Sequence, residues 1–200
     1  LYAMNTSDGS ILWTHTGGSE DISVFGSASP TLYDNIVIAP YSSGEVYALR
    51  ADNGQEIWSN LYSRRSTSIS STLSDIDATP IVSNGQVFII SNDGMLASTD
   101  LKTGQKIWEQ EISGRQSPWV AGDFLYLITI TNEIVCIHAP TGIIKWVQQL
   151  TKYKNAKNKK GAIEWSGPVL AGNFLWVVNS NGKIAAISPV DGTIKYERSV

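Results

Sequence analysis

Apolar and polar residues alternate along this chain in short runs, and turn residues separate the runs. Segments such as 36–41, 87–91 and 174–179 are strongly apolar and lead into a Gly or Asn. Short alternating runs bounded by turn residues are typical of β-strands, and no segment shows the 3.6-residue period of a helix. The pattern therefore predicts an all-β protein made of short antiparallel strands and tight turns.

One pattern occurs five times: a glycine followed, four residues later, by an aromatic residue. A D-G, N-G or T-G pair forms each copy, and such a pair between apolar runs predicts a hairpin turn because glycine accepts a positive φ at little steric cost. The five copies are Gly9/Trp13, Gly54/Trp58, Gly104/Trp108, Gly142/Trp146 and Gly192/Tyr196.

The residues upstream of these turns also keep a fixed spacing. A proline lies 24 residues before each of the last four glycines, at Pro30, Pro80, Pro118 and Pro168. Fourteen residues after each proline lies a turn residue, namely Gly44, Gly94, Asn132 or Gly182. Asn132 fits the pattern because Asn is the residue that best replaces Gly in a left-handed turn. A small residue lies 18 residues after each proline, at Ala48, Ser98, Cys136 and Ala186.

Only the connectors between repeats differ in length, with 22, 10 and 22 residues from the aromatic to the next proline. Fixed units joined by variable connectors indicate a repeat architecture with loops on one face. Four short antiparallel strands in each unit predict β-propeller blades. The whole chain, 1–200, is expected to form a partial propeller with the end of one blade at 1–13 and further blades at 30–61, 80–111, 118–150 and 168–199.

The aromatic residue of each repeat is expected to fill the gap between neighbouring sheets. Full burial of such a ring contributes about 2–3 kcal/mol, so the repeated rings would supply much of the cohesion between blades. Tyr196 replaces Trp in the last copy and is expected to lie near solvent.

Composition and charge exclude several kinds of function. The net charge is −3 and only 16% of residues are charged, with acids and bases interspersed, so no nucleic-acid partner is expected. The single cysteine, Cys136, permits no disulfide within the chain and is expected to be a buried structural thiol. His15 and His138 have no carboxylate or cysteine at ligand or catalytic spacing, so no catalytic residue, metal or cofactor is predicted.

The repeat resembles the tryptophan-docking motif, A-x-D-x-x-T-G-x-x-x-W, of propellers related to pyrroloquinoline-quinone dehydrogenases. The Ala position is held by Ala3, Ala48, Ser98, Cys136 and Ala186. The Asp position is matched only by Asp100, and the Thr position only by Thr103 and Thr141.

A closer resemblance starts at the run 73–88 and continues through 100–108 to Trp146. This part is similar to the family of propeller lipoproteins of the bacterial outer-membrane β-barrel assembly machinery (BamB). The resemblance implies an eight-bladed scaffold on the periplasmic side of the outer membrane, anchored by an N-terminal lipid and without catalytic activity. It also implies binding to the POTRA domains of the barrel-assembly subunit (BamA). Because Leu1 lies inside a repeat, we expect the sequence to be about half of a longer protein.

In that family two neighbouring inter-blade loops form the partner-binding surface. The L-S-D-x-D motif of one loop matches Leu73, Asp75 and Asp77. The L-x-L-R-G motif of the other matches Ile22, Val24 and Phe25, with Phe25 where the family has arginine, so an apolar contact is expected to survive and the charged one is in question.

The residues alone leave two interpretations of each loop open. Asp75 and Asp77 lie on either side of Ile76, so in extended backbone their carboxylates point the same way. They either face a partner together or accept backbone N–H bonds within the loop. The apolar residues of 22–25 form either an exposed docking patch or an edge folded onto the next blade.

Two further expectations concern charge and chemistry. The lysines of the 146–168 connector are expected to form a solvated, mobile loop, with contact to an anionic headgroup or partner as the alternative. They are Lys152, Lys154, Lys157, Lys159 and Lys160. The alternative function is a quinone-dependent dehydrogenase, which the resemblance associates with adjacent cysteines and a bound Ca²⁺, and this sequence cannot form the cysteine pair.

Overall fold

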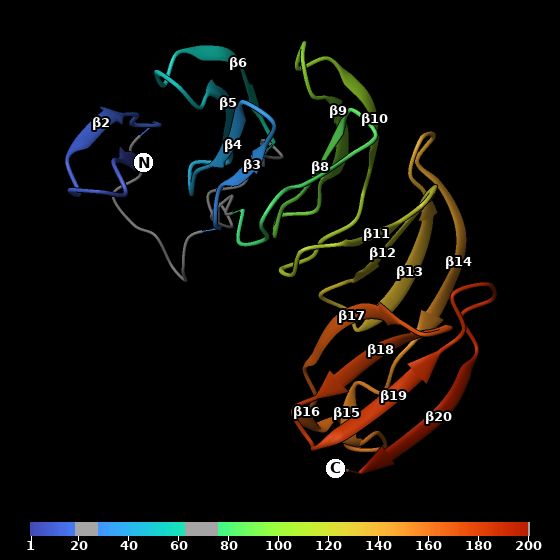
Figure 1. The fold of residues 1–200 in the computed structure, drawn as a ribbon. Coiled ribbons are helices and arrows are strands. Elements are labelled where there is room, and N and C mark those ends of the chain that lie inside the picture. The colour runs from blue at the N-terminus through green and yellow to red at the C-terminus, as the bar shows by residue number, and fades with distance from the viewer. Residues whose placement is uncertain (19–27, 63–75, 200) are drawn as a thin grey trace, which may run out of the picture. The chain divides into compact units, whose positions relative to one another are not determined.

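The computed structural model describes residues 1–18, 28–62 and 76–199, and these residues form strands joined by turns (Figure 1). They contain no helix that is long and apolar enough to cross a membrane. The chain divides into two compact units, Leu1–Ser113 and Gly114–Val200, which are described separately.

The first unit contains a two-stranded sheet and two four-stranded sheets, in which strands that follow one another in the chain pair antiparallel. The two-stranded sheet is β1 (Tyr2–Met4) and β2 (Ile11–Thr14). The next is β3 (Thr31–Tyr33), β4 (Ile36–Pro40), β5 (Glu45–Arg50) and β6 (Glu56–Leu61). The third is β7 (Ile81–Ser83), β8 (Gln86–Ile90), β9 (Leu96–Asp100) and β10 (Lys106–Gln110).

The second unit contains two further four-stranded antiparallel sheets and a small hairpin. The first sheet is β11 (Trp119–Ala121), β12 (Phe124–Ile128), β13 (Glu133–His138) and β14 (Ile143–Gln149). The second is β17 (Trp165–Ala171), β18 (Phe174–Asn179), β19 (Lys183–Ile187) and β20 (Ile194–Ser199). The all-β, four-stranded architecture predicted from the sequence is confirmed.

The lysine-rich connector forms more structure than the sequence predicted. Its backbone pairs as a hairpin of β15 (Tyr153–Asn155) and β16 (Lys160–Ala162), so the expectation of a loop without strands was wrong. Lys159 and Gly161 adopt positive φ values of 50° and 67° at the end of the turn, which lets the chain reverse within a few residues. The lysine side chains from 154 onward are nevertheless exposed, as a charged segment requires.

The aromatic residues of the repeat join neighbouring sheets within each unit. The indole Nε1 of Trp13 donates to the carbonyl of Ala51 at 3.0 Å, and that of Trp58 donates to the carbonyl of Leu101 at 2.8 Å. In the second unit Trp146 donates in the same way to the carbonyl of Pro189 at 3.1 Å. Each of these rings therefore lies between neighbouring sheets, as the sequence predicted, and in addition binds to the turn of the following repeat.

Three of the turn glycines, Gly54, Gly104 and Gly192, are needed for two separate reasons. Gly104 has a φ of +73°, which disfavours any side chain, and a Cβ at this position would lie 2.7 Å from the Trp58 ring. The same contact joins Gly54 to Trp13 and Gly192 to Trp146. Tyr196, in the last copy, is 62% exposed, as expected.

Strand pairing explains the small residue of the repeat. In each copy this residue lies directly opposite the aromatic across the last two strands, next to a β-bulge. Side chains at opposite positions project from the same face with their Cβ atoms about 4.5–5.5 Å apart, so only a small one leaves room for the ring. The pairs are Ala3–Trp13, Ala48–Trp58, Ser98–Trp108, Cys136–Trp146 and Ala186–Tyr196.

The cores lie between neighbouring sheets. In the first unit Ile38, Val46 and Val87 pack with Ile76 and Leu101. In the second unit the core includes Cys136, which is 1% exposed, as predicted for a structural thiol. Burial raises the pKa of this thiol to about 11, so it stays protonated near neutral pH.

Candidate partner-binding site

The predicted partner-binding residues lie on two connectors of the first unit. Leu73, Asp75, Ile22, Val24 and Phe25 lie outside the described residues. Asp77 is described, and so are the points at which both connectors leave and re-enter the sheets.

Asp77 is held by a segment that is anchored on both sides of it. Ile76 and Ala78 are buried, with 1% and 2% of their surface exposed, whereas Asp77 between them is half-buried. The carbonyl of Pro80 accepts a hydrogen bond from Oγ1 of Thr31 in β3. Asp77 is therefore less deeply buried than either of its neighbours.

One oxygen of Asp77 has an unusual environment. Its Oδ1 is buried and has no hydrogen-bond partner among the residues that the structure describes. Most buried polar atoms are paired, and an unpaired one costs about 1–3 kcal/mol. The sequence alone left open whether the acids accept hydrogen bonds from backbone N–H groups of the loop. Among the described residues, Oδ1 of Asp77 accepts no such bond.

The start of the same connector is fixed by Tyr62, which is 1% exposed. Its backbone N–H donates to Gly44, and its hydroxyl lies 2.6 Å from Oγ1 of Thr99. Beside it, Nδ2 of Asn60 donates to the carbonyl of Gly104 at 2.7 Å. These side chains tie the strand end to the next sheet, and sequence analysis missed them because no local pattern shows which sheet a residue following a strand contacts.

The start of the other connector is fixed by a ring cluster. Nδ1 of His15 lies 2.7 Å from the Tyr41 hydroxyl, and its ring centroid lies 4.5 Å from that of Tyr47. The N–H of Gly18 donates to the Glu45 carboxylate at 2.7 Å. Burial lowers the pKa of His15, which favours the neutral ring and agrees with the structural role expected of it.

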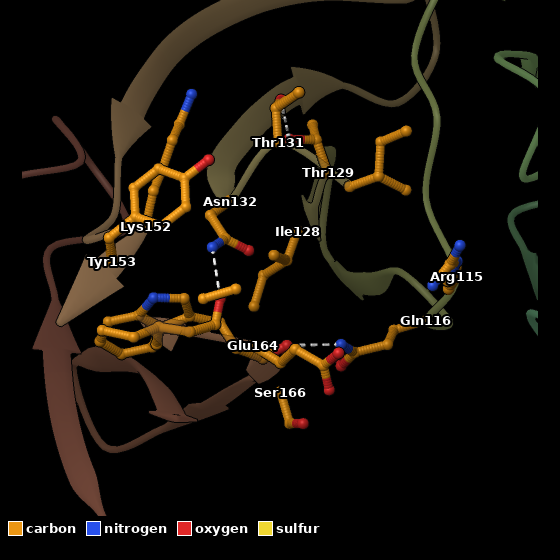
Figure 2. A pocket seen from close by; sticks show the side chains of 14 residues that line it. Arg115, Gln116, Ile128, Thr129, Thr131, Asn132, Lys152, Tyr153, Glu164 and Ser166 are labelled. Carbon is orange, nitrogen blue, oxygen red and sulfur yellow. Dashed lines mark hydrogen bonds between the residues drawn. The ribbon is translucent and has the colours of Figure 1, made fainter. Parts of the chain in front are cut away.

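The second unit contains a pocket of about 590 Å³ that no sequence motif indicated (Figure 2). Three segments far apart in the chain line it: 115–116, 128–132, and both ends of the connector that carries the β15–β16 hairpin. A volume of about 300–1,000 Å³ is typical of ligand pockets. The tertiary structure alone brings these segments together.

Side-chain amides brace the walls of this pocket. Nδ2 of Asn132 donates to the carbonyl of Ile163 at 2.6 Å (Figure 2). Gln116 uses both ends of its amide, because Nε2 donates to the carbonyl of Trp165 at 2.6 Å and Oε1 accepts from the N–H of Gly167 at 2.9 Å. The walls are therefore linked to one another before any ligand arrives.

Hydroxyl groups and charges of both signs line the pocket. Its lining includes the hydroxyl residues Thr131 and Tyr153, the cationic Arg115 and Lys152, and the carboxylate of Glu164. Within the described parts of the chain, no three His, Cys, Asp or Glu residues gather closely enough to hold a metal ion.

Four-stranded antiparallel sheets, linked by a tryptophan that binds the glycine turn of the next repeat, define a β-propeller protein of the quinone-dehydrogenase-like repeat class. Residues 1–148 match the family model described as "Outer membrane protein assembly factor BamB". The chain belongs to this family. It is 29% identical over 202 aligned residues to the factor of that name from Yersinia pestis, in a match that covers 100% of this chain and 49% of the relative.

Solved structures agree on the fold. The chain matches the crystal structure of BamB from Moraxella catarrhalis with a TM-score of 0.84 at 22% identity, over 100% of this chain and 58% of that chain. It also matches a quinohemoprotein alcohol dehydrogenase from Pseudomonas putida with a TM-score of 0.76 at 16% identity, over 100% of this chain and 39% of that chain. The chain spans about half the length of the curated relatives it matches.

Proposed function

We propose that this chain is part of a non-catalytic scaffold subunit of the machinery that assembles β-barrel proteins in the bacterial outer membrane. It acts on the periplasmic side of that membrane, where a lipid anchor holds the whole subunit. Membership of the BamB family supports this proposal. The likeness to a dehydrogenase at 16% identity concerns the fold alone and brings no chemistry to this chain.

The proposed partner is the POTRA region of the barrel-assembly subunit BamA. It is bound by the connector that carries Leu73, Asp75 and Asp77 together with the connector that carries Ile22, Val24 and Phe25. The observation that carries this proposal is the buried, unpaired Oδ1 of Asp77. The half-buried carboxylate of Asp77 would accept a charge-assisted hydrogen bond from an N–H donor of the partner, which is stronger than a neutral one.

The anchored ends of both connectors explain how such a surface keeps its affinity. Tyr62 and Pro80 fix one connector, and His15 and Gly18 fix the start of the other. A surface whose supports are already ordered loses less conformational entropy on binding. The scaffold therefore contributes by holding the described ends of both connectors in place and not by reacting.

The test removes or reverses charge on the acidic connector and measures how much of the purified BamA POTRA domains each variant captures. Asp77→Asn keeps the shape of the side chain and removes its charge, so we expect capture to weaken about tenfold, which corresponds to one lost charge-assisted hydrogen bond. Asp75→Lys combined with Asp77→Asn should weaken it further.

Asp52→Asn is the matched control, because Asp52 is exposed in the same unit and pairs with Arg50. It should leave capture unchanged. Melting temperatures of all variants show whether they are folded. Full capture by a folded variant that carries both connector changes would refute the proposed contact.

A further inference from the structure

The lysine hairpin next to the pocket is a concentration of positive charge in an acidic chain. Five of the chain's 15 basic residues lie between 152 and 160, a stretch without any Asp or Glu, although the net charge of the chain is −3. Among the described residues, none of these five lysines forms a salt bridge. Their charge is therefore not balanced by neighbours in the described structure.

The hairpin and the pocket are parts of one surface. Lys152 and Tyr153 at the start of the hairpin line the pocket, and so does Ala162 at its end. Tyr153 and Ala162 are directly paired in the hairpin, so their side chains share a face. A ligand seated in the pocket would continue toward the exposed Lys160, which lies two residues before Ala162 on the same face of the hairpin.

We propose that this surface, the pocket together with the β15–β16 hairpin, binds an extended acidic segment of a polypeptide. Acidic side chains of the ligand would meet the hairpin lysines, and its backbone would lie in the pocket. This is a second site in the second unit, built from residues other than those of the proposed POTRA contact, so either proposal can fail without the other.

The mixed polarity of the lining favours a polypeptide over an anionic lipid surface. Glu164 faces the pocket on the side of Gln116, whereas Lys152 lies on the side of Asn132 (Figure 2). A carboxylate repels a dense layer of phosphates but accepts hydrogen bonds from backbone N–H groups. The hydroxyl groups of Thr131 and Tyr153 can donate to backbone carbonyls in the same way.

The bracing of the walls supports binding by a preformed site. Asn132 and Gln116 fix the turn at 129–132 and the segment before β11 to the chain around Ile163–Gly167. The indole of Trp165 also donates to the carbonyl of Thr151 at 2.9 Å, which closes the base of the hairpin. A ligand would therefore find the pocket already open, and little ordering cost would reduce its affinity.

The test uses two fluorescent peptides and the 200-residue chain. One peptide alternates Glu and Val, and its partner alternates Gln and Val. Fluorescence anisotropy should show binding of the Glu peptide, about tenfold weaker binding of the Gln peptide, and weakening by added salt, because exposed charges are screened. Equal affinity for the two peptides would overturn the preference for an acidic ligand.

Two kinds of variant distinguish the contribution of the hairpin to peptide binding from that of the pocket. Lys157→Glu with Lys160→Glu reverses charge at the tip of the hairpin and on the face that carries Tyr153 and Ala162, and it should lower affinity for the Glu peptide at least about tenfold. Lys145→Glu with Lys195→Glu makes the same change in net charge on exposed positions of β14 and β20, and it should have little effect. A loss of the same size in this control would show that only net charge matters and would overturn the proposal.

Ala162→Trp fills the pocket without changing charge, and Thr131→Trp does so from an exposed position of the opposite wall. Both should abolish binding of the Glu peptide in a chain that keeps its melting temperature. Unchanged affinity in either folded variant would overturn the assignment to the pocket. Binding to vesicles of phosphatidylglycerol and phosphatidylethanolamine without binding of the Glu peptide would replace the polypeptide with a membrane surface.

Discussion

Ser98 occupies the small-residue position of its repeat but suits that position less well than its equivalents do. Its equivalents in the other repeats include Ala48, Cys136 and Ala186, and all of these face an aromatic ring across the sheet. The position requires a small side chain and offers no hydrogen-bond partner. Ser98 is 0% exposed, and its hydroxyl Oγ has no hydrogen-bond partner within the described parts of the chain.

We therefore predict that Ser98→Ala stabilises the protein by about 1–2 kcal/mol, because it removes a buried hydroxyl that is unpaired. Urea unfolding measures the difference. Ser91→Ala is the matched control, since Ser91 is equally buried but its hydroxyl donates to Asp93 and accepts from the N–H of Met95. This control should destabilise by about 1 kcal/mol, and a loss of stability in Ser98→Ala would contradict the interpretation.

The strand pair that ends each repeat acts as a docking element. In three repeats the turn glycine, Gly54, Gly104 or Gly192, receives the tryptophan of the preceding repeat, and in every described copy the aromatic lies opposite the small residue. A β-bulge beside that pair sets the register in every described copy. The sequence indicated the turn and the ring, but the bulge and the pairing partner were not predicted, because they depend on how two strands align.

We predict that Gly104→Ala destabilises by about 2–5 kcal/mol, since the added Cβ must adopt a positive φ and also displace the Trp58 ring. Gly85→Ala is the control in the same sheet. Gly85 has a φ of +74°, and a Cβ added there would meet no atom within 4 Å, so this variant should lose only about 1–2 kcal/mol. Equal losses in urea unfolding would mean that ring docking contributes nothing beyond backbone strain.

At the scale of the whole molecule, we propose that the connectors carry the binding function and that the repeats provide the stability. The repeats keep one spacing throughout, whereas the connectors vary in length and carry both candidate surfaces. Binding residues are often found on loops that a rigid scaffold positions. Changes in chain length should therefore have very different effects in the two kinds of segment.

We predict that one glycine inserted between Gly142 and Ile143 destabilises by about 3 kcal/mol or more. The insertion shifts β14 by one residue, moves Trp146 to the other face of the sheet and breaks its contact with Gly192. The same insertion at the hairpin tip, between Lys157 and Asn158, should cost less than about 1 kcal/mol.

Urea midpoints and the labelling rate of the buried Cys136 thiol, which lies opposite Trp146, measure both effects. Faster labelling is expected only for the insertion in the turn. Equal tolerance of the two insertions would contradict the division between repeats and connectors.

The repeats could be predicted from the amino-acid sequence, because strand alternation and turn chemistry are local. Asn132 is the clearest case: it replaces Gly in the pattern and adopts a φ of 59°, the left-handed conformation expected of it. The resemblance of the segment around Asp75 and Asp77 also indicated the family to which the chain belongs.

The contacts of the connectors, in contrast, were established by the three-dimensional structure. The contacts of Tyr62 with Thr99, of Gln116 with Trp165 and of Asn132 with Ile163 join residues 31–49 positions apart. No local rule specifies such contacts, because they depend on which sheets become neighbours. For the same reason the pocket, the paired lysine hairpin and the unpaired oxygen of Asp77 could not be predicted from the sequence.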